Sequence, residues 1–368
     1  MVVSEEFSWK MFRGNVMRTG TSSSNLSRRP SLQRVMELGP MVASPVFDNS
    51  IVYAATITGR IFALKAYHWR IKWQSNIGSP IISSPSIQQD LLIAATFDSW
   101  VKGTAFLGKN LVLALNAKTG EQVWSFEIDG DIFSSPCIIQ DMIIVGSMNK
   151  NILAIDMRGH LKWVFETEGE VWSSPSFNGE QIFVGSDDGF LYCLNLEGKI
   201  QWRKRLYGKI RSSSPCLSYY NNLIFIGTHN GALYCLNQSD GLIRWSKQIT
   251  KPVLSSAAVL KDRVFFASSD KKIYCIDCNT GSKIWEFETG GRIWSSPAIA
   301  ENDKVLFFGS LDSHIYGLDM ITGKQIWKFP TMNMIDSSPC IASKMLFIGA
   351  RDGLLYAFGS REIASYVR

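Results

Sequence analysis

Few residues of this 368-residue chain are of types that could do chemistry, and they lie in different repeats of the sequence. The four histidines fall in or beside predicted turns, at His68, His160, His229 and His314. The pair Cys275-Ile-Asp-Cys278 has a spacing found in redox and zinc sites. On a strand, however, an offset of three residues sends the two side chains to opposite faces. We therefore interpret both cysteines as small buried side chains, and the sequence predicts no metal site.

Serines and aspartates are the remaining candidates for catalysis. Ser-Ser-Pro and its close variants recur along the chain, so no single serine stands out as a nucleophile. We expect these serines to hydrogen-bond the backbone instead. Single aspartates stand in predicted turns, at Asp188, Asp270, Asp312 and Asp352. Because calcium needs six to eight oxygen ligands and Asp favours tight turns, we interpret them as turn formers. The sequence predicts no catalytic residue and favours a protein that is not an enzyme.

The whole chain is built on one repeat. The proline after the paired serines, or its equivalent, recurs at intervals of 39 to 51 residues, at Pro45, Pro85, Pro136, Pro175, Pro215, Ala257, Pro297 and Pro339. A tryptophan keeps the same rhythm, at Trp73, Trp124, Trp163, Trp202, Trp245, Trp285 and Trp327. A period near 40 residues with several short strands per unit is typical of a β-propeller. The sequence therefore predicts an all-β propeller of eight four-stranded antiparallel blades, with seven blades as the alternative.

Residues 173–202 contain the clearest copy of one blade. Their pattern predicts four strands, at 173–177, 181–186, 190–195 and 199–203, separated by turns such as Asn178-Gly179. Eight repeats begin with the serine motif, but only seven contain the tryptophan of the outermost strand. Trp9 could be the eighth, so we expect residues 5–16 to form the closing strand of the last blade.

This organisation divides the chain into three parts. We expect residues 1–368 to form a single propeller domain, with the closing strand at 5–16, a connecting segment at 17–41 and the repeats at 42–360. A closed ring of this kind leaves no free sheet edge between its first and last blades.

Composition narrows the function classes. Apolar residues make up 46% of the chain and aromatic residues 12%, which is ample for a core. The formal net charge is +6 and the basic residues are scattered, which argues against a nucleic-acid partner. No apolar run is long enough to span a membrane. The first residues do not resemble a signal peptide, so we expect a cytoplasmic protein, or a periplasmic one if an export signal precedes this sequence.

The motifs resemble those of a known family over nearly the whole chain. They are the opening Trp9-x-x-Phe-Arg-Gly-Asn15, the following Arg18-Thr-Gly20, and the repeated Gly-Ser-x-Asp-Gly-x-Leu-Tyr and Thr-Gly-x-x-x-Trp. The chain is similar to the pyrroloquinoline-quinone-like propellers. That group includes quinoprotein dehydrogenases, the propeller lipoprotein of the outer-membrane β-barrel assembly machinery, and propeller domains appended to adenylating enzymes. The resemblance implies that each tryptophan docks between blades, and it implies a fold more strongly than a function.

The resemblance also raises the question of a quinone cofactor. Quinoprotein dehydrogenases hold the quinone and a calcium ion over the ring axis with residues from long insertions, and often use a disulfide between adjacent cysteines. This chain has no Cys-Cys pair and almost no insertions. We therefore expect no cofactor.

The largest break in the repeat predicts a binding site. The second blade carries about ten extra residues between Thr96 and Leu111, where other blades have a short turn. Several residues in and beside this insertion are apolar, namely Phe97, Trp100, Phe106 and Leu107. Apolar side chains on a loop suggest a lid or a contact surface for a partner.

A second candidate site is the mouth of the central channel. One residue enters each innermost strand there, and around the ring these are Val42, Ile82, Phe133, Trp172, Arg211, Leu254, Trp294 and Asp336. Phe133, Trp172 and Trp294 give this mouth an aromatic surface, and Arg211 and Asp336 give it charge. An extra serine after Arg211 suggests a bulge that changes the direction of its side chain. The alternative is that these residues only fill the channel.

Together these features predict a monomeric ring that is a non-enzymatic scaffold or recognition module. It would bind a protein partner through the channel face and the second-blade loop. The alternative function is a propeller that binds or transforms a small molecule at the aromatic mouth, and a quinone-dependent dehydrogenase is the least favoured form of that alternative.

Overall fold

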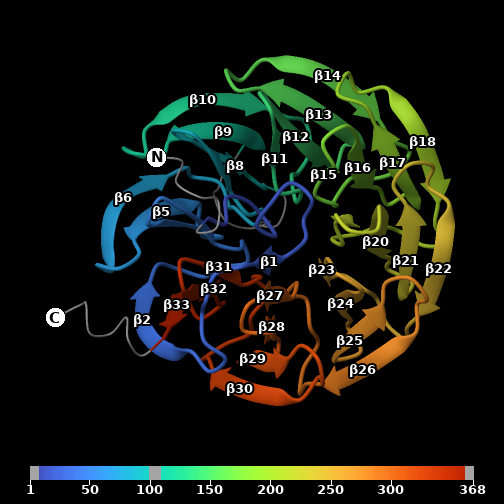
Figure 1. Ribbon diagram of the computed structural model, residues 1–368. Coiled ribbons are helices and arrows are strands. Elements are labelled where there is room, and N and C mark those ends of the chain that lie inside the picture. The colour runs from blue at the N-terminus through green and yellow to red at the C-terminus, as the bar shows by residue number, and fades with distance from the viewer. Residues whose placement is uncertain (1–7, 99–108, 361–368) are drawn as a thin grey trace.

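The protein is a ring of eight four-stranded antiparallel blades, as the computed structural model shows for residues 8–98 and 109–360 (Figure 1). The predicted all-β class and the predicted eight blades are confirmed. In the fourth blade the strands lie within three residues of their predicted bounds. Among the described residues, none forms a helix of the length and hydropathy that crossing a membrane requires.

Each blade is assembled in sequence order from the axis outward, except the eighth, whose outermost strand comes from near the N-terminus. The innermost strands are β3 (Val46–Asp48), β7 (Ser86–Gln88), β11 (Cys137–Ile139), β15 (Ser176–Phe177), β19 (Cys216–Leu217), β23 (Ala258–Leu260), β27 (Ala298–Ala300) and β31 (Cys340–Ala342). The second strands are β4 (Ile51–Ala55), β8 (Leu91–Ala95), β12 (Met142–Ser147), β16 (Ile182–Gly185), β20 (Leu223–Gly227), β24 (Arg263–Ala267), β28 (Val305–Ser310) and β32 (Met345–Gly349). The third strands are β5 (Arg60–Lys65), β9 (Leu111–Asn116), β13 (Asn151–Asp156), β17 (Phe190–Leu194), β21 (Ala232–Asn237), β25 (Lys272–Asp277), β29 (His314–Asp319) and β33 (Leu354–Gly359). The outermost strands are β6 (Arg70–Asn76), β10 (Gln122–Glu127), β14 (Leu161–Glu166), β18 (Ile200–Arg205), β22 (Ile243–Gln248), β26 (Lys283–Glu288), β30 (Gln325–Pro330) and β2 (Ser31–Glu37).

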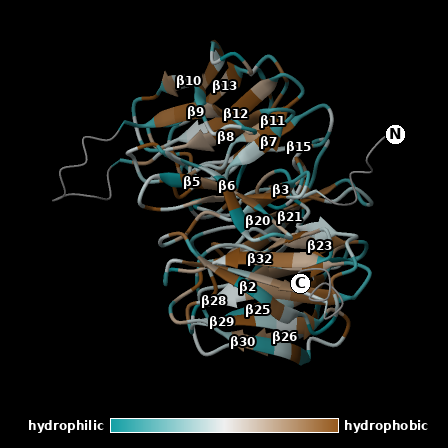
Figure 2. Ribbon diagram, turned by 90° about the vertical axis from the view of Figure 1, so that its left-hand side faces the viewer, coloured by the Kyte–Doolittle hydropathy of each residue, from teal (hydrophilic) through white to brown (hydrophobic). Residues whose placement is uncertain are grey.

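Hydrophobic packing between neighbouring blades forms the core. The second and third strands are almost fully buried, whereas outermost strands such as β22 alternate between exposed and half-buried residues. Figure 2 shows the corresponding pattern, with apolar strands inside the blades and polar residues at many turns. Strands that are buried on both faces need continuous apolar runs, which is the pattern of the repeat.

The recurring tryptophan joins each blade to the next. Trp245 Nε1 donates a hydrogen bond of 2.8 Å to the carbonyl of Cys278 in the following blade. A Cβ on Gly281, which has φ +70°, would lie 2.8 Å from the Trp245 ring, so this turn requires glycine. Five further tryptophans make the equivalent hydrogen bond, Trp73 to Ala117, Trp124 to Met157, Trp163 to Leu196, Trp202 to Gln238 and Trp285 to Met320. The docking that the family resemblance implies is therefore present.

Eight serines form a closed belt of hydrogen bonds around the axis. The N–H of each serine donates to the hydroxyl of the serine in the next blade at 2.9 to 3.0 Å, and the last donates to the first. The belt consists of Ser44, Ser84, Ser135, Ser174, Ser214, Ser256, Ser296 and Ser338. All eight are buried. The expected role of the repeated serines in bonding the backbone is confirmed.

The segment 9–24 crosses one end of the channel and touches every blade (Figure 1). Trp9 exchanges two 2.8 Å backbone hydrogen bonds with Phe47 of the first blade. Carbonyls of Lys10, Val16, Met17, Thr19 and Gly20 accept N–H groups from innermost strands of five other blades. The short β1 (Thr21–Ser22) then pairs in parallel with β27.

Two buried arginines add contacts to four blades, one of which, the third, the backbone hydrogen bonds do not reach. Arg18 donates to the carbonyls of Ser135 at 3.2 Å and Pro175 at 3.0 Å, in the third and fourth blades. Arg13 donates to the carbonyls of Ala257 and Pro297. Burial lowers the pKa of Arg13 to about 10, so its guanidinium stays charged at neutral pH.

The segment that closes the eighth blade differs from the expected one. The fourth strand there is Ser31–Glu37, which pairs antiparallel with β33, whereas residues 5–16 were expected at this position. Arg34 pairs with Ala357, where the other blades pair a tryptophan with a small residue. Trp9 is 1% exposed and packs in the core instead. The prediction was wrong because Trp9 was taken as the eighth copy of a tryptophan that this blade does not contain.

Removing one belt hydroxyl should destabilise the whole ring. In a Ser256→Ala variant the buried N–H of Ser214 loses its acceptor, which should lower the free energy of unfolding by about 1–3 kcal/mol. Guanidinium denaturation followed by tryptophan fluorescence measures this loss. Ser212→Ala, at an exposed serine outside the belt, serves as the control, and an equal loss in both variants would contradict the role of the belt.

Removing one buried arginine should have a larger effect. Arg18→Met removes the arginine donor from the carbonyls of Phe12, Ser135 and Pro175, so we expect a loss of about 3 kcal/mol or more. Limited proteolysis should then cut within residues 9–24 before it cuts the blades. Arg28→Met, at an exposed surface ion pair, should be near neutral.

Candidate functional site

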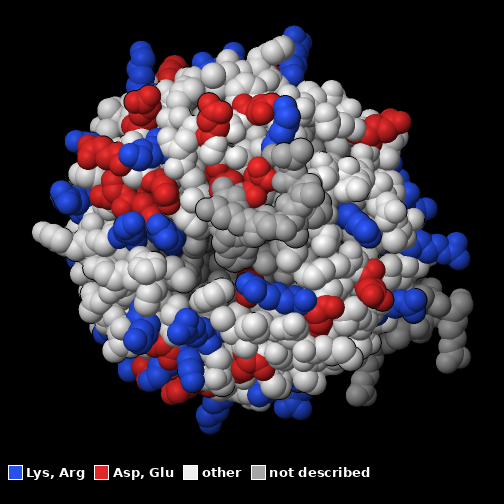
Figure 3. Space-filling view, turned by 180° about the vertical axis from the view of Figure 1, so that it is seen from behind, with Lys and Arg blue, Asp and Glu red and all other residues white. Residues whose placement is uncertain are grey.

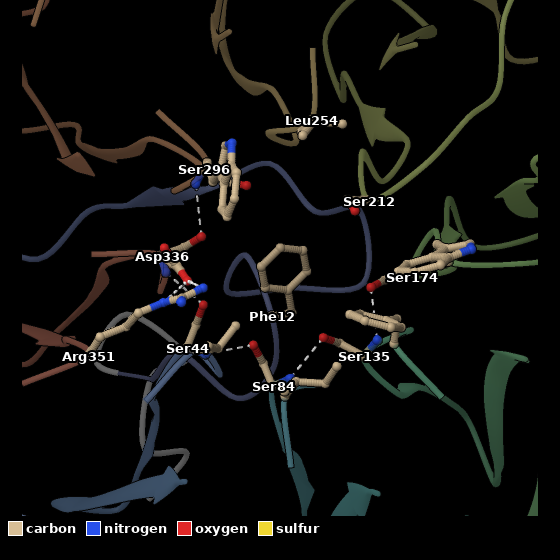
Figure 4. Close-up of a pocket in the computed structure, with 16 residues that line it drawn as sticks. Phe12, Ser44, Ser84, Ser135, Ser174, Ser212, Leu254, Ser296, Asp336 and Arg351 are labelled. Atoms are coloured by element: carbon tan, nitrogen blue, oxygen red, sulfur yellow. Dashed lines mark hydrogen bonds and ion pairs between the residues drawn. The ribbon is translucent and has the colours of Figure 1, made fainter. Parts of the chain in front are cut away.

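The channel is a cup that opens on one face of the ring. Its volume is about 340 Å³, and the aromatic ring of Phe12 lies near its centre in the view of Figure 4. Because Phe12 belongs to the segment that crosses the other end of the channel, that segment forms the floor of the cup. The upper wall is mostly apolar, with Val42, Ile82, Phe133, Trp172, Leu254 and Trp294. Six serines of the belt lie below them, Ser44, Ser84, Ser135, Ser174, Ser296 and Ser338.

Seven of the eight residues expected at the mouth line this cup, and Arg211 does not. The extra serine of the fifth blade forms a tight turn before β19, where a bulge was expected. Ser212 has φ 64°, and the N–H of Ser213 donates to the carbonyl of Arg211 at 2.7 Å. Ser212 therefore takes the place in the wall, and the Arg211 side chain turns outward to Asp187.

An array of aromatic rings runs along one side of the mouth. The Phe97 and Phe133 rings pack edge to face with centroids 4.6 Å apart, and Phe133 stacks on Trp172 at 4.0 Å. The guanidinium of Arg211 lies 4.5 Å from the centre of the Trp172 ring, a cation–π contact. Glu170 accepts the Trp172 N–H at 2.8 Å and fixes the orientation of the indole. Side chains from four blades are thus held in one rigid row.

One ion pair supplies the charge in the cup. Arg351 Nε donates to Asp336 Oδ2 at 2.6 Å, and the Asp336 side chain is only 5% exposed. Burial raises the pKa of Asp336, although the nearby Arg351 opposes the shift. Asp336 was predicted at this mouth and lies there. Sequence reasoning missed Arg351 and Phe12, since neither stands at the repeat position that defines the mouth.

The insertion of the second blade is described only at its edges. Trp100, Phe106 and Leu107 lie outside the described residues. Phe97 is 2% exposed, because it packs under Phe133 rather than on the surface. Phe97 therefore supports the aromatic row.

Beside the cup lies a second, polar cavity between the fourth and fifth blades. This blade 4–5 groove has a volume of about 350 Å³ and is lined by Asp187, Asp188, Gly189, Arg205, Leu206, Tyr207, Gly208, Lys209 and Asn230. Asp187 binds Arg211 through Oδ2, and its Oδ1 is buried without a hydrogen-bond partner in the described part of the chain. The Arg211–Asp187 pair therefore separates the groove from the aromatic row.

In the part of the chain that the structure describes, the cup lacks the oxygen ligands that the calcium ion of quinoprotein dehydrogenases would need. Asp336 is the single carboxylate among the described residues that line it, and Arg351 already pairs with it. Nowhere in residues 8–98 and 109–360 do three His, Cys, Asp or Glu side chains come together as metal ligands would. The predicted turn aspartates instead accept the hydroxyls of Tyr192, Tyr274, Tyr316 and Tyr356.

Basic and acidic side chains are mixed on the face shown in Figure 3, among the residues that the structure describes. Lys and Arg side chains lie around the edge of the face shown in Figure 3, with Asp and Glu side chains between them. A nucleic-acid footprint needs a continuous basic stripe.

The blades, the docked tryptophans and the axial cup define a propeller of the pyrroloquinoline-quinone-like type. A family profile described as the beta-propeller of beta-alanine-activating enzyme matches residues 109–366, well over half of the chain. The chain therefore belongs to this propeller family. A second profile, described as outer membrane protein assembly factor BamB, matches residues 15–127.

Solved structures with this fold have varied functions. BamB from Moraxella catarrhalis is similar with a TM-score of 0.75 and 18% identity, over 90% of this chain and 98% of BamB. A europium-containing methanol dehydrogenase has a TM-score of 0.79 and 14% identity, over 99% of this chain and 92% of the dehydrogenase. Quinohemoprotein alcohol dehydrogenase from Comamonas testosteroni has a TM-score of 0.80 and 14% identity, over 97% of this chain and 81% of the dehydrogenase. A search of curated proteins found no significant match. At these identities the structures show the fold alone.

The cysteines should be inert in the folded protein. All seven are buried and free, and Cys275 and Cys278 pack in different hydrophobic clusters, as their strand positions predict. Burial raises the pKa of Cys275 to about 12, so its thiol stays protonated at pH 8. We expect iodoacetamide to label none of them at pH 8 and all seven in guanidinium, as counted by mass spectrometry. Fast labelling of the native protein would contradict this assignment.

Proposed function

We propose that this propeller is a non-enzymatic recognition module that binds a protein partner on its open face, through the cup and the second-blade loop. The observation that carries the proposal is the cup itself. It is apolar, closed at its floor and lined by rigid aromatic side chains, three of which were predicted from the repeat. Such pockets accept the anchor residues that dominate many protein interfaces.

Other observations support this role. The charged groups of the cup are paired with one another, which suits binding better than catalysis. The partial match to an outer membrane protein assembly factor supports a scaffold and favours the periplasmic alternative over the predicted cytoplasmic location. The propeller would act as a monomeric ring.

A second candidate is the binding of a small molecule in the same cup. The volume of about 340 Å³ lies at the lower end of the range for ligand pockets, and it favours this candidate. Both candidates involve Trp294. The experiment must therefore measure the mass of the bound species, which separates a protein partner from a small molecule.

Native mass spectrometry of the protein from its own cells provides that test. We expect a stoichiometric protein partner, and we expect Trp294→Ala to reduce the bound fraction at least tenfold, as is usual for an aromatic anchor. Shortening residues 99–108 should also weaken the complex. Tyr219→Ala is the matched control, because Tyr219 is 80% exposed in a turn at the opposite end of the innermost strands.

Each alternative outcome has a separate meaning. An added mass of a few hundred daltons that disappears in Trp294→Ala would support the small-molecule candidate. A protein complex that persists in Trp294→Ala but is lost in Tyr219→Ala would place the partner on the other face and contradict the proposal.

A further inference from the structure

The cup and the blade 4–5 groove lie next to each other on the same face. Trp172 lines the cup and Asp187 lines the groove, and the Arg211 side chain contacts both. Arg211 contacts the Trp172 ring at 4.5 Å, and its Nε donates to Asp187 Oδ2 at 3.0 Å. An extended chain rises about 3.3 Å per residue, so two or three residues would span the gap between the Trp172 ring and the Asp187 carboxylate.

The wall of the cup has its smallest side chain on this side. Elsewhere the position above the belt is held by a large side chain or by Asp336, whereas the fifth blade has the small, exposed Ser212. The tight turn that places Ser212 there also removes Arg211 from the wall. One structural change thus opens the cup toward the groove.

Asp187, which lines the groove, has a carboxylate oxygen that is unpaired in the part of the chain that the structure describes. The Asp187 side chain is only 4% exposed, and its Oδ1 lacks a hydrogen-bond partner among the described residues. A buried, unpaired carboxylate oxygen costs free energy, which a bound N–H or ammonium group would recover. Lys209 Nζ lies 3.6 Å from Asp187 Oδ2 and is largely exposed, and Asn230 lines the same groove.

From these contacts we infer that one extended segment of the protein partner occupies both cavities. An apolar side chain of the segment fills the cup, and the chain passes over Ser212 into the groove. There the segment donates a hydrogen bond to Asp187 Oδ1, and its carbonyls accept from Lys209 and Asn230. A peptide fits because its backbone supplies donors and acceptors in alternation. This inference rests on the proposed function and adds the direction of the partner across the ring.

Site-specific photo-crosslinking in cells tests the path. Benzoylphenylalanine replaces Trp294 in the cup, Tyr207 in the groove, or Tyr219 on the opposite face as a control. We expect the first two positions to crosslink to one partner, at sites within about ten residues of each other in its sequence. The control position should give no crosslink to that partner.

A pair of variants tests the role of Asp187. Asp187→Ala removes the acceptor and should reduce the crosslink from position 207 at least tenfold. Asp262→Ala removes an exposed carboxylate from a turn at the opposite end of the innermost strands and should leave that crosslink unchanged. Circular dichroism of both variants verifies folding. Equal losses in the two variants, or an undiminished crosslink in Asp187→Ala, would overturn the inference.

The outcomes separate this inference from the proposed function. Crosslinking at position 294 without crosslinking at position 207 would overturn the path into the groove and leave the recognition role intact. Crosslinks from the two positions to distant parts of the partner would have the same meaning. No crosslink to any protein at either position would refute the recognition role, and the inference with it.

Discussion

The closed belt of serine hydrogen bonds is the constraint on which the rest of the structure depends. Each serine is both donor and acceptor, so the cycle is complete only when every blade contributes one residue at the same height. Because the donors and acceptors are buried, an incomplete cycle would leave backbone N–H groups unpaired in the core. The belt therefore holds the innermost strands at a common distance from the axis. The docked tryptophans do the equivalent work farther out, between adjacent blades.

The segment across one end of the channel turns this symmetric ring into a molecule with two different faces. Arg13 and Arg18 bind carbonyls that the strands leave unpaired near the axis, and Phe12 projects toward the belt. The channel is consequently a cup rather than a pore. Any ligand that reaches the belt has to enter through the mouth, so the residues around that mouth are the ones that select it.

Repetition decides which of these features can be predicted from sequence. Eight blades, the strand order and most of the mouth follow from residues that recur at a regular interval. The closing strand does not, because Arg34 stands where the repeat has tryptophan. Leu32-Gln33 still resembles Ile200-Gln201 of the fourth blade, and this similarity was the available signal. Phe12, Arg351 and the groove beside Asp187 depend on how segments far apart in sequence meet, which no local pattern reports.

The pairing of β2 with β33 has a consequence for how the protein is made. It joins strands more than 300 residues apart, and bringing the ends of so long a loop together costs about 5 kcal/mol in chain entropy. The segment 9–24 likewise needs innermost strands from the last blades. The strand β2 is thus made before the blades but is among the last elements to reach its final place. Until β33 has been synthesised, β2 lacks its partner strand, so the ring closes only after the last blade is made.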